Sequence, residues 1–275
     1  RMKYRETLTP DSFYVSLKGL EQWAETTDKP MDRAVLNSLI AGIYADYASS
    51  NRWQIRQRTN IVDEAPSSDI REWSSNMFVQ QVMKYTAGSL QDTGLLLNTS
   101  SRIYIPFVKL GDTSEYYHHD MLHLLGSRGV DALNNVMGLD KDSVVQTSVE
   151  NVYLGMLDAY EKAGMDDGYV LCKLDYLNWK RNSDPTFVPY RAPQNLIGLT
   201  QDPYLTGLDK LKADFKSHDV CAEVYLAKAR YAVEKQQQVM ALQICDEAIR
   251  LYPDYKRINA LKNLKQEILN PALYV

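Results

Sequence analysis

The chain has 275 residues, of which 45% are hydrophobic and 24% are charged, as expected for a folded globular protein and not for a disordered one. Its formal net charge is −4, so the chain does not present the positive potential that attracts the phosphates of nucleic acid. Nucleic acid is therefore not an expected partner. No apolar run approaches the roughly 18 residues that span a bilayer, so this segment is not expected to insert into a membrane.

The first two predicted helices form a hairpin. The first should begin where Thr9 can cap, Pro10 fits the first helical position and Asp11 favours the positive end of the helix dipole. It should end near Thr27, with an inner apolar stripe of Phe13, Leu17, Leu20 and Trp23. A second helix should pack antiparallel on the first through a broad apolar face made of Val35, Leu36, Leu39, Ile40, Ile43, Tyr44 and Tyr47.

Four more helices and one extended connector are expected before residue 182. The third helix should start near Asp69, whose side chain can cap while Glu72 reaches back, and run to Tyr85. The stretch 100–110 has strand character but is interrupted by Pro106, so we expect an extended connector there. The remaining helices are expected from Thr113, over about 143–163, and over a segment that includes 169–179.

A change of composition at 183–200 predicts an irregular connector that contains Pro185, Pro189 and Pro193. The sequence therefore predicts a helical hairpin domain at 1–182 and a further helical region at 201–270, either separate from the first or continuous with it. Four helical patterns in the second region start near Asp202, Val220, Gln238 and Tyr255. The expected fold class is all-α, with antiparallel helical hairpins that build an α-α superhelix.

One hairpin near the carboxy terminus has the spacing of a tetratricopeptide repeat. Small residues at Ala241, Cys245 and Ala248, followed by Pro253, match the second helix of such a repeat. The preceding helix has compatible alanines but lacks the usual tryptophan and Leu-Gly positions. An unrelated helical hairpin is the alternative, because alanine is common wherever helices cross.

The histidines at 118–123 are the feature most suggestive of chemistry. His119 and His123 lie four residues apart on an expected helix, a spacing that lets two imidazoles reach one zinc ion. In a zinc peptidase a glutamate follows the first histidine, whereas Asp120 stands here and no later histidine supplies an obvious third ligand. We therefore expect no metal site and keep His119 and His123 as candidates.

No other pattern indicates catalysis or a cofactor. The sequence has no GxSxG elbow, phosphate-binding loop or dinucleotide-binding turn. The odd number and wide spacing of Cys172, Cys221 and Cys245 favour neither a disulfide framework nor a metal knuckle. One small interaction patch is a candidate, formed by Arg52, Trp53 and Arg56.

Five stretches of the sequence resemble the amino-terminal helical region of the large alpha-2-macroglobulin-like envelope proteins of Bacteroidetes. They read TPDSFY at 9–14, IYADY at 43–47 with NRW at 51–53, LLNTSS at 96–101, YYHHD at 116–120, and RINALKNL at 257–264 with Asn-Pro at 270–271.

The resemblance implies that the chain is one segment of a larger periplasmic or extracellular envelope protein whose macroglobulin domains trap proteases. Such proteins commonly use a thioester in a C-x-E-Q sequence. Here Cys221 is followed by Ala222, Glu223 and Val224, so the last position of that motif fails. By this resemblance the segment would contact protein surfaces, including other domains of the same chain, without catalysing a reaction.

Three hypotheses follow for function. The first is a noncatalytic protein-interaction or spacer region of an alpha-2-macroglobulin-like protease inhibitor. The second is a zinc-dependent enzyme built on His119 and His123, which stoichiometric zinc would reveal. The third is a free-standing tetratricopeptide-like adaptor, which the full gene product would distinguish from the first.

Overall fold

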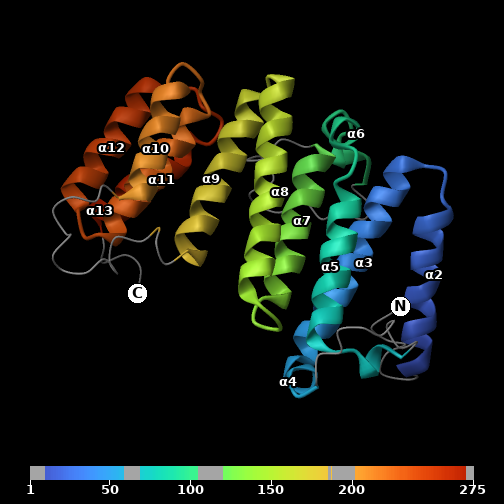
Figure 1. Cartoon of the computed structure of the whole chain (residues 1–275). Coiled ribbons are helices and arrows are strands. Elements are labelled where there is room, and N and C mark those ends of the chain that lie inside the picture. The colour runs from blue at the N-terminus through green and yellow to red at the C-terminus, as the bar shows by residue number, and fades with distance from the viewer. Residues whose placement is uncertain (1–9, 59–68, 105–119, 185–186, 188–201, 271–275) are drawn as a thin grey trace. The chain divides into compact units, whose positions relative to one another are not determined.

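The computed structural model describes residues 10–58, 69–104, 120–184, 187 and 202–270 (Figure 1). Within these residues the chain forms twelve α-helices and two short 3₁₀ helices, and no strand. In the stretch 100–110, where the sequence predicts an extended connector, Ser100 forms an isolated antiparallel bridge with Asp120. The prediction is wrong for 101–104, which form a 3₁₀ helix, and 105–110 lie outside the described residues. The all-α fold class predicted from the sequence is confirmed.

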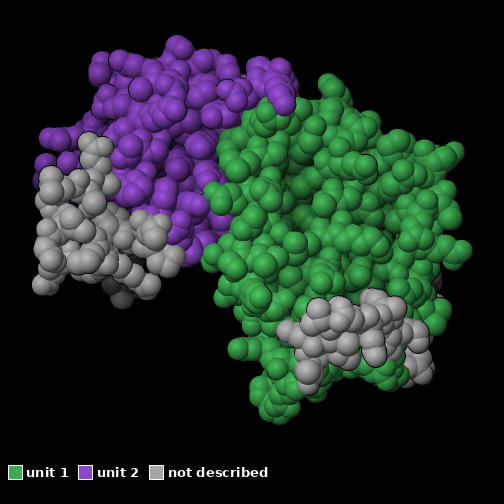
Figure 2. All heavy atoms as spheres, in the orientation of Figure 1, with its two compact units in different colours: residues 1–111, 119–159 green, residues 112–118, 160–275 purple. Residues whose placement is uncertain are grey.

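The chain divides into two compact units, which Figure 2 shows in different colours. Unit 1 comprises residues 1–111 and 119–159, and unit 2 comprises residues 112–118 and 160–275. The helices of unit 1 are α2 (Pro10–Thr26), α3 (Pro30–Ser50), α4 (Arg52–Arg56), η1 (Ile70–Glu72), α5 (Ser75–Ser89), α6 (Thr93–Leu97), η2 (Ser101–Tyr104) and α7 (Met121–Val136). Helix α8 (Asp142–Ala163) contains the division, and the helices of unit 2 are α9 (Asp166–Ser183), α10 (Pro203–Asp214), α11 (Cys221–Glu234), α12 (Gln238–Leu251) and α13 (Ile258–Leu269).

Helix α3 is the centre of unit 1 and packs against α2, α5 and α7. Its aromatic side chains explain this position. The ring of Tyr44 lies 5.3 Å from that of Trp73 and 6.0 Å from that of Tyr85, while Tyr47 lies 5.7 Å from Phe78. Stacked rings of this kind add to the free energy gained from burial itself, so the aromatic cluster joins α3 to α5 and to the segment before it.

The predicted inner stripe of α2 is partly wrong. Phe13 and Leu17 are buried as expected, but the side chain of Trp23 is 53% exposed. The buried face continues instead through Glu21 and Ala24. On α3, likewise, Leu39 is exposed although the prediction placed it inward.

Glu21 is buried because three neighbours satisfy its carboxylate. The Tyr44 hydroxyl donates a 2.6 Å hydrogen bond to one oxygen, and the Lys18 ammonium lies 2.7 Å from the other. Burial opposes ionisation of Glu21, but the hydrogen bonds from Lys18, Tyr44 and Tyr85 outweigh it and hold the pKa of this carboxyl below its ordinary value.

One predicted helix start in unit 1 is corrected by the structure. Asp69 does cap, but it caps η1, and α5 begins only at Ser75 because Trp73 and Ser74 have extended backbones. Helix α7 begins at Met121, after Asp120, whose side chain accepts a hydrogen bond from the His123 amide. The expected start at Thr113 lies outside the described residues.

In unit 2, α9 to α13 surround one core, in which α11 contacts α9, α10, α12 and α13. The predicted starts of the helices near Asp202, Val220 and Gln238 agree with α10, α11 and α12 to within one residue. Asp202 caps α10 by accepting hydrogen bonds from two backbone amides. The last helix starts at Ile258, three residues after the expected Tyr255, because 255–257 form a turn.

Small residues allow α11 and α12 to approach closely. Ala229 on α11 and Ala241, Cys245 and Ala248 on α12 are all fully buried. This packing is compatible with the predicted tetratricopeptide-like hairpin, which stays a prediction.

The division into units differs from the predicted domain boundary. The prediction placed α9 with the first domain and a connector at 183–200, most of which lies outside the described residues. In the structure α9 belongs to unit 2 and packs on α10 and α11. Gly168 of α9 faces the ring of Tyr160 at the end of α8, so closely that an added Cβ would lie 2.5 Å from a ring carbon.

Candidate functional site

The strongest candidate site is a polar pocket of about 390 Å³ in unit 2. Its walls are one face of α9 and one face of α11, because its residues recur at intervals of three and four along both helices. Tyr204 of α10 and Arg257 complete the lining. From α9 come Leu174, Asp175, Asn178 and Arg181, and from α11 come Glu223, Leu226, Ala227, Arg230, Tyr231 and Glu234.

Arg181 forms one wall of this pocket and joins three helices. Its guanidinium carbon lies 5.1 Å from the ring centroid of Tyr204 and 4.6 Å from that of Tyr231, and it pairs with the Glu234 carboxylate. The Tyr204 hydroxyl in turn donates a 2.7 Å hydrogen bond to Asn178. These contacts fix the positions of both tyrosines. The positive charge of Arg181 already interacts with groups of the protein itself.

A second wall is built around Glu223, whose residue is only 5% exposed. The Arg257 guanidinium lies 2.9 Å from its carboxylate, and the Tyr255 hydroxyl donates a hydrogen bond of the same length. Burial raises the pKa of Glu223, although the charge of Arg257 and the hydrogen bond from Tyr255 act in the opposite direction. Glu223 is therefore occupied by partners from the turn before α13.

Asp175 and Arg230 are the charged groups of the pocket that remain available. Neither side chain has a hydrogen bond or an ion pair with the described residues. Burial raises the pKa of Asp175 to about 7, and no neighbouring charge offsets this effect. The pocket thus presents a carboxyl group that changes charge near neutral pH, together with an exposed guanidinium.

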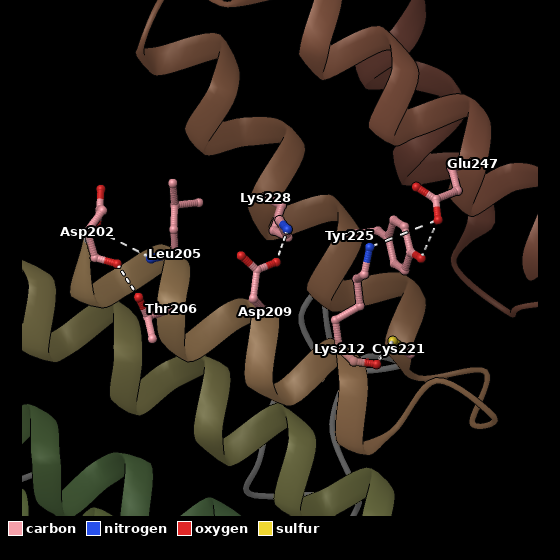
Figure 3. A network of polar contacts seen from close by, with 9 residues as sticks. All are labelled: Asp202, Leu205, Thr206, Asp209, Lys212, Cys221, Tyr225, Lys228 and Glu247. Atoms are coloured by element: carbon pink, nitrogen blue, oxygen red, sulfur yellow. Dashed lines mark hydrogen bonds and ion pairs between the residues drawn. The ribbon is translucent and has the colours of Figure 1, made fainter.

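Polar contacts on the other side of α11 hold this helix in place (Figure 3). Lys228 of α11 pairs with Asp209 of α10, and the Tyr225 hydroxyl donates a 2.9 Å hydrogen bond to Glu247 of α12. The Lys212 ammonium lies 4.8 Å from the Tyr225 ring centroid. Because α11 is tied to two neighbours, the pocket side chains that it carries are presented on a well-packed helix.

Unit 1 contains an apolar pocket of similar volume, about 390 Å³, between α5, α7 and α8. The Thr86 hydroxyl, which belongs to the lining, is buried and has no hydrogen-bond partner among the described residues. No charged side chain lines this pocket, so it offers fewer groups for recognition than the polar pocket of unit 2.

The predicted histidine pair is only partly described. His119 lies outside the described residues, while His123 is buried in the first turn of α7 with Nε2 3.3 Å from the Ser127 hydroxyl. Asp120 is engaged as the cap of that helix. No group of three potential metal-ligating side chains occurs in the described part of the chain, and the zinc hypothesis for His119 and His123 stays untested by the structure.

The predicted patch at Arg52, Trp53 and Arg56 is divided by the structure. The Arg52 guanidinium donates hydrogen bonds to the Met137 carbonyl and, at 2.7 Å, to the Asn135 carbonyl, so it closes the end of α7. Trp53 is 74% exposed and Arg56 is also exposed. An interaction surface there would consist of Trp53 and Arg56 alone.

Sequence reasoning missed the pocket in unit 2. The polar residues Asp175, Asn178 and Arg181 recur every three residues beside the apolar stripe of α9, and this pattern was the available signal. What it could not supply is the partner face, because α11 lies about fifty residues further along the chain.

Comparisons of the chain with protein-family models, with curated proteins and with solved structures give no match. No helix of the described residues has both the length and the apolar character needed to cross a bilayer.

Proposed function

We propose that the chain is a noncatalytic helical interaction region, and that unit 2 binds a segment of a protein partner in the pocket between α9 and α11. The observation that carries the proposal is that Asp175 and Arg230 form no hydrogen bond or ion pair with the described residues, in a cavity whose other charges are already paired. A protein segment can meet such a lining with its backbone amides and side chains.

The noncatalytic part of the proposal rests on the chemistry of the lining. The described residues of the lining supply carboxyl, guanidinium, amide and phenol groups, and they include no cysteine, serine or histidine. The three cysteines are buried, and burial raises the pKa of both Cys221 and Cys245, which disfavours the reactive thiolate.

A peptide-library selection tests the proposal. Random linear 12-residue peptides displayed on phage are selected against the full chain, and the affinity of the lead peptide is measured by calorimetry. Ala227 is partly buried in the lining, so Ala227→Trp should fill the pocket and weaken the lead peptide at least tenfold. The matched control is Val239→Trp on α12, whose parent side chain is 72% exposed and outside the pocket.

Binding that is lost in the Ala227→Trp variant alone supports the proposal. Equal affinity in both variants, or a selection that yields no binding peptide, contradicts it. Thermal unfolding of each variant shows whether the loss reflects the pocket or the fold.

For the biological context, we propose the helical region of an alpha-2-macroglobulin-like envelope protein. The support is the set of sequence stretches at 9–14, 43–53, 96–101, 116–120 and 257–271, and an all-α fold is compatible with it. Detection of the native gene product by immunoblot tests this context. A product far larger than 31.5 kDa in the envelope fraction supports it, and a 31.5 kDa product in the cytoplasm contradicts it and favours the free-standing adaptor.

A further inference from the structure

We propose that the pocket between α9 and α11 receives a basic side chain, Lys or Arg, of the bound segment, with the Asp175 carboxylate as its counter-ion. This inference rests on the proposed function and adds the chemistry of the partner. It assigns to Asp175 a role in recognition.

The other acids of the pocket cannot take this role without losing a partner. Glu223 already holds Arg257 at 2.9 Å and accepts a hydrogen bond from Tyr255. Glu234 is paired with Arg181. Asp175 is thus the carboxyl group of the lining that has no cation or hydrogen-bond donor in the described part of the chain.

The cations of the pocket do not neutralise Asp175 either. Arg181 lies between two tyrosine rings and Arg257 lies on Glu223. Arg230 is the remaining guanidinium, but it is exposed and does not form an ion pair with Asp175. A cation from outside would therefore pair with a carboxyl group that has no direct partner among the described residues.

Binding of a cation at Asp175 should be linked to release of its proton. Burial raises the pKa of the free group to about 7, and a bound ammonium or guanidinium would lower it again. The other charged and titratable groups of the lining are Arg181 on α9, Tyr204 on α10, Glu223, Arg230, Tyr231 and Glu234 on α11, and Arg257 before α13. Affinity should consequently rise about tenfold per pH unit below pH 7 and level off above it.

The test uses the lead peptide from the library selection, with each of its basic residues in turn replaced by Gln. With the native chain at pH 8, one such replacement should reduce affinity at least tenfold. With the isosteric variant Asp175→Asn, the native peptide should bind weakly and the same replacement should change affinity less than twofold. Asp254→Asn, which changes an exposed acid outside the lining in the same way, is the matched control and should keep the requirement for the basic residue.

Three results would overturn the inference. A pocket-bound peptide that contains no required basic residue, equal sensitivity to the Gln replacement in native and Asp175→Asn chains, or a required acidic residue that depends on Arg230 each contradicts it. In all three the peptide still responds to Ala227→Trp, so the proposed function survives. If no peptide responds to Ala227→Trp, the proposed function fails and the inference fails with it.

Discussion

The guanidinium carbon of Arg181 lies 4.6 Å from the ring centroid of Tyr231, and this contact joins α9 to α11 beside the pocket. Tyr204 of α10 lies on the same guanidinium group at 5.1 Å. Arg181 therefore belongs both to the packing of unit 2 and to the wall of its candidate site, and changes there should affect stability and binding together.

Arg181→Ala should lower the free energy of unfolding of the chain by about 1–2 kcal/mol, because it removes two cation–π contacts and one partly exposed ion pair. Arg181→Lys keeps the charge but loses the flat stacking surface, so its loss should be intermediate. Urea denaturation followed by tryptophan fluorescence measures both. Equal stability of the alanine variant and the native chain would disprove the role of the stack.

Glu21 should make the stability of unit 1 depend on acid pH. Hydrogen bonds hold its pKa below the ordinary value of 4.5, so the folded state keeps its carboxylate charged where the unfolded state has begun to bind a proton. This contribution is fully present above pH 4.5 and is lost as the pH falls through the lowered value. Glu21→Gln should therefore flatten the loss of stability on acidification.

Glu21→Ala leaves the buried Tyr44 hydroxyl without this acceptor, which should cost about 2–3 kcal/mol. Tyr44→Phe is the milder counterpart, with an expected cost of about 1 kcal/mol. Denaturation at pH 7 gives the free energy of unfolding of both variants. If Glu21→Ala costs no more than Tyr44→Phe, the buried hydrogen bond is not the main interaction of Glu21.

Asp175→Asn should stabilise the protein at neutral and alkaline pH. The native group has a pKa of about 7 in the folded state and an ordinary value of 3.8, so between these values the folded state retains a proton that the unfolded state has lost. Stability should fall by up to about 1.4 kcal/mol for each pH unit in that window and then level off. The asparagine variant should lack this decline, which unfolding curves from pH 4 to pH 8 would show.

Gly168→Ala should destabilise unit 2, because the added Cβ would lie 2.5 Å from the rigid ring of Tyr160. Gly155→Ala in α8 is the matched control, since nothing lies within 4 Å of its added Cβ. The control should gain up to about 1 kcal/mol of helix propensity, while Gly168→Ala should lose about 1–3 kcal/mol. Thermal unfolding of the two variants should shift in opposite directions.

Helical periodicity and capping predict much of this fold from the sequence. The start of α2 at Pro10 and the cap of α10 at Asp202 follow from local chemistry, which depends only on neighbouring residues. Where the predictions fail, a residue far away in the sequence determines which side chain is buried. Glu21 is buried and Trp23 is exposed because Tyr44 of α3 supplies a hydrogen bond that the sequence of α2 does not reveal.

The candidate site shows the same limit. Arg52 belongs to a basic run in sequence, yet it closes the end of α7, whose carbonyls lie 83 to 85 residues away along the chain. The sequence gives no signal that marks Asp175 as a site residue, because a single acid on a helix is ordinarily solvated. Only the packing of α9 on α11 makes it partly buried.

The most direct measurement is hydrogen–deuterium exchange of the full chain with and without the lead peptide of the library selection. Backbone amides report where a bound segment slows opening of the helices. We expect added protection concentrated on α9 and α11, and we expect this protection to be lost in Asp175→Asn. Protection confined to the helices of unit 1, or unchanged by Asp175→Asn, would contradict a peptide-binding pocket centred on Asp175.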